Sequence, residues 1–118
     1  MQEKWVFDWQ EQDPKDSLKA SLESLFSEKA KELGIFLSYY TRSEGAIAEN
    51  VRLLEMEEPL SPQEGSLWLG FQKVHYNACL NIHETDLDKI QVRYLIDPSV
   101  GKLVLTGPYV PEREPDEL

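Results

Sequence analysis

The sequence predicts an α+β domain in which one amphipathic helix packs on an antiparallel β-sheet, a meander of about four to five strands. Three observations carry this prediction. Apolar residues recur at spacings of three and four from Leu18 to Leu33, which is helical periodicity and predicts a helix over Pro14–Leu33. Apolar and polar residues alternate from Val74 to His83 and again from Ile90 to Ile96, which is strand periodicity. Between Ile96 and the β-prone run Leu103–Thr106, the segment Asp97–Gly101 has the proline and glycine of a tight hairpin.

The N-terminal elements follow from local signals. Trp5, Phe7 and Trp9 share one parity, which predicts a short first strand rich in aromatic residues. Asp13 is a good N-cap and the next residue is proline, a combination typical of a helix start. Gly34 stands where a left-handed C-cap is expected. The helix is therefore predicted to end at residue 33.

The middle of the chain is less regular. Ile35–Tyr40 is β-prone and predicts a strand, and Thr41–Gly45 predicts a turn. Ala46–Met56 fits both a helix and a strand, and we favour the strand because a helix followed by a meander is compact. The two prolines within Glu57–Gly65 predict a loop.

Trp68 and Gly70 have the same even-numbered parity as the apolar residues in the alternation from Val74 to His83. It predicts a buried face carrying Val74 and a wet face carrying His75. An unbroken strand from Leu67 to His83 would be roughly 56 Å long, well beyond the usual length of strands. We therefore expect a bulge or turn near Gly70–Lys73, and a polar loop at Glu84–Lys89.

Composition limits the classes of function. The 118 residues suit a single domain, predicted over residues 1–107, followed by an acidic, proline-rich tail over residues 108–118. A net charge of −10 repels nucleic acid and anionic lipid and favours a basic protein partner. The single cysteine cannot form an internal disulfide, and the N-terminus does not have the pattern of a signal peptide. We expect a cytoplasmic protein.

Catalytic and metal chemistry are not predicted. His75, Cys79 and His83 are spaced by four, which on a strand separates neighbours by about 13 Å, too far to share a metal ion. The chain contains none of the common catalytic motifs. We expect no metal, no cofactor and no enzymatic activity. The alternative is a small-molecule module or small enzyme that uses a polar sheet face with His75, Asn77, Cys79 and Asn81.

The aromatic residues point instead to a protein-binding surface. Tryptophan is enriched at the energetic centres of interfaces, and carboxylates near it would favour a basic partner. The predicted partner-binding set is Trp5, Trp9, Trp68, Glu55, Glu57 and Glu58. In size and charge alone, the chain is similar to small acidic secretion chaperones, immunity proteins and antitoxins. Homodimerisation through a sheet edge or an aromatic arm is compatible with either function.

Overall fold

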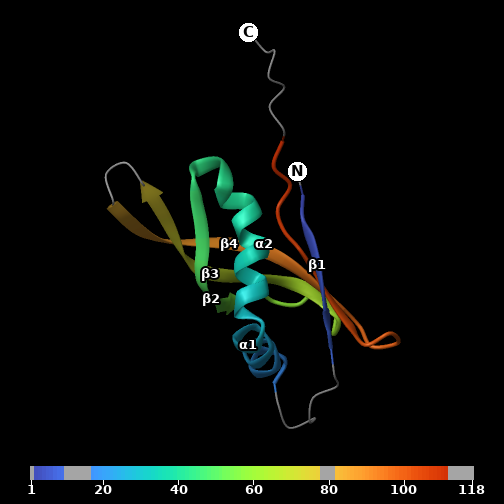
Figure 1. Ribbon diagram of the computed structural model, residues 1–118. Coiled ribbons are helices and arrows are strands. Elements are labelled where there is room, and N and C mark those ends of the chain that lie inside the picture. The colour runs from blue at the N-terminus through green and yellow to red at the C-terminus, as the bar shows by residue number, and fades with distance from the viewer. Residues whose placement is uncertain (1, 10–16, 78–81, 112–118) are drawn as a thin grey trace.

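The computed structural model describes residues 2–9, 17–77 and 82–111, with residues 76, 77 and 82–84 described by their backbone. Within these residues, two helices pack on a five-stranded antiparallel sheet of order β1-β5-β4-β3-β2 (Figure 1). The predicted α+β class is confirmed. The helices are α1 (Leu18–Glu28) and α2 (Ala30–Thr41), and the strands are β1 (Lys4–Asp8), β2 (Ala46–Met56), β3 (Glu64–Asn77), β4 (Ile82–Asp97) and β5 (Lys102–Thr106).

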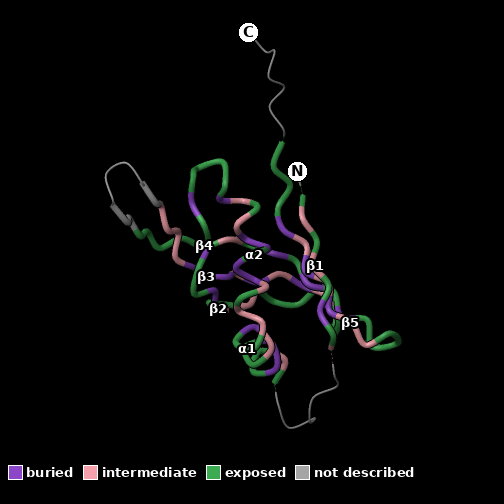
Figure 2. Tube along the Cα trace, viewed as in Figure 1, coloured by how far each residue is buried: buried purple, intermediate pink, exposed green. Residues whose placement is uncertain are grey.

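The core lies between the helices and one face of the sheet. Figure 2 shows the buried segments gathered where the strands pass behind α2, while in the β3–β4 arm that extends beyond the helices the described residues of β3 are half-buried and those of β4 are exposed. Alternate residues of each strand contribute to this core, as expected for a sheet covered on one side. The side chains that are completely buried include Leu22, Phe26, Leu33, Phe36, Leu37, Leu67, Leu69, Leu103 and Leu105.

The predicted single helix is wrong in its extent. The chain forms two helices separated at Lys29, which leaves the helical conformation with φ −104° and ψ 24°. Ser17 is the N-cap of α1, and its hydroxyl accepts a hydrogen bond from Ala20 N at 3.1 Å. Asp13, the predicted cap, lies outside the described residues. The sharp change of direction at Lys29 (Figure 1) lets both Phe26 and Phe36 reach one core.

The strand predicted over Ile35–Tyr40 is also wrong, because these residues belong to α2. Leu33, Phe36 and Leu37 are buried and Ile35 is exposed, which is the spacing of a helix face. Gly34 is inside the helix and not at its end. An added Cβ there would lie 3.0 Å from the carbonyl oxygen of Ala48. Helix burial has overridden local β-propensity, and Gly34 allows α2 to approach β2 closely.

The turn over Thr41–Gly45 and the strand over Ala46–Met56 are confirmed. A short 3₁₀ helix, Arg42–Glu44, ends at Gly45, whose φ is 72°. Asn50 has a φ of 52°, and the register of β2 against β3 shifts between Glu49 and Arg52. This bulge explains the ambiguous pattern in the sequence. It adds one residue to β2, so the buried positions are even-numbered up to Ala48 and odd-numbered from Val51.

The β3–β4 hairpin corrects three predictions. β3 runs without interruption through Gly70–Lys73, and β4 runs through Glu84–Lys89, so neither the bulge or turn nor the polar loop is present there. The single strand over Val74–His83 is wrong as well, because β3 ends at Asn77 and pairs with the start of β4. The buried parity of β3 is that of Leu67, Leu69 and Phe71, opposite to the prediction.

The reason is the length of the helical layer. The covered face of β3 is apolar through Phe71, and beyond it the same parity continues with Lys73. Lys73 Nζ lies 3.1 Å from Glu44 Oε1 and 3.2 Å from Asp88 Oδ2. An ion-pair cluster therefore replaces apolar packing where the helices end, and this leaves the alternation from Val74 onward without a core to face.

The remaining predictions for the sheet are confirmed. β1 contains Trp5 and Phe7 and pairs with β5, and residues Asp97–Gly101 close the β4–β5 hairpin with Gly101 at φ 63°. The loop predicted over Glu57–Gly65 ends at Glu64, where β3 begins. Residues 108–111 continue without a strand, and the rest of the predicted tail lies outside the described residues.

Tyr94 is the one buried side chain in the described part of the chain whose polar atom has no hydrogen-bond partner. Its ring lies over Gly65 on the neighbouring strand, where an added Cβ would come within 2.7 Å of the hydroxyl. Because a buried unpaired hydroxyl is unfavourable, Tyr94→Phe is expected to leave the free energy of unfolding unchanged or to raise it by up to about 1 kcal/mol. Urea denaturation at neutral pH measures this directly.

The matched control is Tyr40→Phe, since the Tyr40 hydroxyl accepts a hydrogen bond from Glu3 N and donates one to the Pro108 carbonyl. We expect it to cost about 1 kcal/mol. Burial raises the pKa of Tyr94 above its ordinary value, so the unfolded chain loses this proton at lower pH than the folded chain. Stability falls as the pH rises above about 10, and Tyr94→Phe should reduce that loss. If Tyr94→Phe lowered the free energy of unfolding at neutral pH as much as Tyr40→Phe does, the Tyr94 hydroxyl would not be unpaired in the folded protein.

Candidate functional site

The face of the sheet opposite the helices is covered by no element that the structure describes. Side chains of alternate residues reach solvent on this face, which we call the open face. A few of them are large and apolar, and the most exposed are Leu87 at 73%, Val6 at 58% and Ile47 at 53%. These three residues lie on different strands, and exposed apolar side chains that are scattered singly do not by themselves mark an interaction site.

Trp68 is held in place on this open face by side chains from two other segments. Its indole Nε1 donates a hydrogen bond to Glu57 Oε1 at 3.0 Å. Gln91, on the neighbouring strand β4, donates to the same oxygen at 2.7 Å. Because the indole donor and the carboxylate fix each other, the ring is presented to solvent in one orientation.

A cation of the same chain already lies on this ring. Lys89 Nζ is 5.0 Å from the centre of the Trp68 ring, within the range of a cation–π contact. Glu55 is directly opposite Trp68 on β2 and is exposed. We call Trp68, Glu57, Lys89 and Gln91 the Trp68 cluster. Its chemistry, an aromatic ring backed by a carboxylate, is that of a site for an ammonium or guanidinium group.

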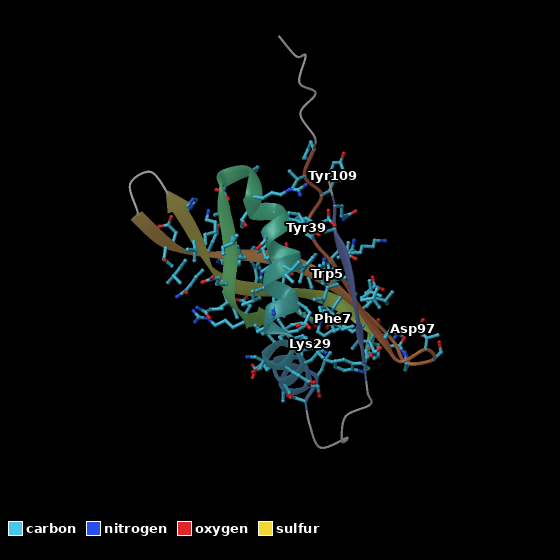
Figure 3. The ribbon with its side chains drawn as sticks, viewed as in Figure 1. Trp5, Phe7, Lys29, Tyr39, Asp97 and Tyr109 are labelled. Carbon is cyan, nitrogen blue, oxygen red and sulfur yellow. The ribbon has the colours of Figure 1, made fainter. Side chains whose placement is uncertain are left out.

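The predicted partner-binding residues do not form one surface. Glu55, Glu57 and Trp68 come together on the open face, and Glu58 is exposed in the loop after β2. Trp5 and Trp9 instead pack against the core. Trp5 is stacked on Phe7 with ring centres 6.4 Å apart and contacts Phe36 at 5.9 Å, and Figure 3 shows Trp5 and Phe7 on the strand beside α2.

The alternative site around His75 is placed only in part. His75 lies near the end of β3, and its Nε2 is 3.7 Å from Asp86 Oδ2 on β4. Asn77 is the last residue of β3, while Cys79 and Asn81 lie outside the described residues. In the part of the chain that the structure describes, no group of three or more His, Cys, Asp or Glu side chains is arranged to hold a metal ion.

Sequence reasoning missed Lys89 and Gln91. Lys89 falls within the predicted loop Glu84–Lys89, although Lys89, Gln91 and Arg93 form an alternating polar series in the sequence. That series is the signal that could have placed them on one strand face. Their contact with Glu57 depends on the β3–β4 register and on the chain path after β2, which periodicity alone does not specify.

The comparisons add no family to this description. Searches against protein-family models, curated proteins and solved structures returned no match for the chain. Among the described residues, no helix has both the length and the apolar character required to cross a membrane.

Proposed function

We propose that this protein is a non-enzymatic interaction module that binds a basic segment of a protein partner on its open face. The observation that carries the proposal is the Trp68 cluster, in which one carboxylate fixes the aromatic ring and a lysine lies over it. A partner's lysine or arginine would take the place that Lys89 occupies. Such an anchor is rigid before binding, which lowers the entropic cost of association.

Charge supports the same proposal. The chain carries a net charge of −10, which speeds the approach of a basic partner and opposes binding to nucleic acid and anionic membranes. Glu55 and Glu58 are exposed beside the cluster and would form a carboxylate rim around the aromatic anchor. Rim charges act mainly on the rate of encounter, while the buried part of the ring supplies affinity. A cytoplasmic location belongs to the same proposal, since the single cysteine cannot form an internal disulfide.

The experiment is a titration of the ¹⁵N-labelled protein with a short peptide rich in lysine and arginine. The indole N–H signal of Trp68 is expected to shift and those of Trp5 and Trp9 to stay. Glu57→Gln should weaken binding at least threefold, since it removes the charge behind the ring. Lys89→Met should strengthen binding, since it removes the internal competitor for the ring. Raising the salt concentration should weaken peptide binding by both variants.

The matched control is Glu23→Gln, which removes one exposed carboxylate from α1, on the covered side of the sheet. Equal weakening by Glu23→Gln and Glu57→Gln would show that only net charge matters and would contradict the assigned site. Absence of any Trp68 shift at low salt would reject the proposal as a whole. A His75→Ala variant with reduced peptide binding would favour the polar site near the end of β3 instead.

A further inference from the structure

The two margins of the sheet differ in how their outward backbone groups are satisfied. At the β2 margin, side chains of α2 occupy two of them. Ala48 N donates to the Ser38 hydroxyl at 3.0 Å, and the Thr41 hydroxyl donates to the Ala46 carbonyl at 2.8 Å. Farther along, the bulge at Asn50 interrupts the edge. Capping and bulges are two of the means by which proteins keep an edge strand from pairing.

The β1 margin has neither device in the described residues. Gly107 N donates to the Glu3 carbonyl and Trp9 N donates to the Gly101 carbonyl, so the odd-numbered residues of this segment bond to β5. Because the bonding direction alternates along an antiparallel strand, the N–H and C=O groups of Lys4, Val6 and Asp8 point away from the sheet. No described strand pairs with them.

The side chains on this margin are complementary to a second copy of themselves. Lys4 and Asp8 lie two residues on either side of Val6. In an antiparallel pair of β1 strands centred on Val6, each Lys4 faces the Asp8 of the other copy and the two Val6 residues face each other. Lys4, Val6 and Asp8 each then face a residue of the other copy as a hydrogen-bonded pair. The two residues of each pair exchange two backbone N–H···O=C bonds. Like charges directly opposite each other would oppose pairing in this register, whereas here opposite charges face each other.

The rows across the sheet continue this complementarity. Val6 lies beside Val104, and Val104 lies beside Leu95. Pairing two copies at Val6 would therefore extend one apolar row across both open faces. In the neighbouring row, Lys102 forms an ion pair with Asp8, so Asp8 would lie between Lys102 and the Lys4 of the other copy. A carboxylate has enough acceptor sites to serve two donors.

We propose that the protein forms a two-fold symmetric dimer in which the β1 strands of two copies pair in antiparallel fashion about Val6, joining the two sheets into one. This interface is separate from the Trp68 cluster, and it leaves the open face of each copy accessible. The interface is isologous, as a two-fold dimer requires.

The test is the mass of the full chain by sedimentation equilibrium over a concentration series at about 0.15 M ionic strength, where the net charge is screened beyond about 8 Å. The wild type is expected to reach twice the monomer mass. Lys4→Asp alone and Asp8→Lys alone each place like charges opposite each other twice, and each should raise the dissociation constant about tenfold or more. A one-to-one mixture of these two variants should form a heterodimer, because opposite charges again face each other at both positions.

A second pair of variants tests the backbone contacts. Val6→Pro removes an outward N–H that takes no part in the bonding of β1 to β5, so the fold is retained and the dimer should be lost. Val6→Thr keeps that N–H and the branched shape and should still dimerise. Leu87→Asp, at the far end of the open face, should have no effect. A wild type that stays monomeric at all concentrations, or a mixture that fails to restore the dimer, would overturn the proposal. Neither result depends on peptide binding at Trp68.

Discussion

Replacing Phe36 by alanine is expected to lower the free energy of unfolding by about 3–5 kcal/mol, the range for removing a buried aromatic ring. Phe36 is completely buried, and its ring joins two parts of the molecule. It contacts Trp5 on β1 at 5.9 Å and Tyr40 on its own helix at 6.0 Å, the latter edge-on at 90°. The substitution removes both ring pairs in addition to the buried area. Urea denaturation followed by circular dichroism measures the loss.

Phe36→Leu is the control, because it keeps an apolar side chain of intermediate size. It is expected to cost less than half as much as the alanine variant. Ile35→Ala, at the neighbouring exposed position of α2, should change stability by less than about 0.5 kcal/mol. A loss below about 1 kcal/mol for Phe36→Ala would contradict the packing of α2 against β1.

Replacing Gly107 by alanine is expected to destabilise the fold by about 1–3 kcal/mol through overpacking. The new Cβ would clash with the Tyr40 hydroxyl, and two carbons of the Tyr40 ring would lie within 2.8 Å of it. The ring must move, and the hydroxyl then loses its hydrogen bonds with Glu3 N and the Pro108 carbonyl. These bonds tie α2 to the start of β1 and to the chain after β5, so both segments should loosen together.

A double-mutant cycle separates this clash from a general effect of the methyl group. In a Tyr40→Ala background, the added Cβ meets no ring, and Gly107→Ala should cost far less than in the wild type. Gly45→Ala is not a suitable control, because Gly45 has a positive φ that alanine disfavours. An equal cost in both backgrounds would show that Tyr40 is not the obstacle.

The sequence predicted the fold class and most strands because those features depend on local patterns. Turn residues defined the β4–β5 hairpin, and alternation defined Ile90–Ile96. Errors arose where tertiary packing overrides local preference. The β-prone residues around Phe36 form a helix because that face is buried. The buried parity of β3 was assigned to Val74 because the alternation is strongest where the helices no longer cover the sheet.

The types of residue in the candidate site could be predicted from the sequence. Which of these residues come together in the fold could not. Aromatic and acidic side chains in a chain of net charge −10 indicated a protein-binding surface. Which tryptophan lies on the open face depends on the parity of each strand relative to the helices, and that parity is a property of the whole fold. The pairing of Glu57 with both Trp68 and Gln91 depends further on the loop that follows β2.

The hydroxyl groups of Ser38 and Thr41 also bear on how far association could proceed. They occupy the Ala48 amide and the Ala46 carbonyl at the β2 margin, so a sheet that joins another through β1 would have these two groups occupied at each of its new ends. Together with the bulge at Asn50, these occupied groups oppose further edge pairing through β2 and so favour a closed pair of copies over an open-ended filament. Two small polar side chains on one helix would thus help to limit association to a pair.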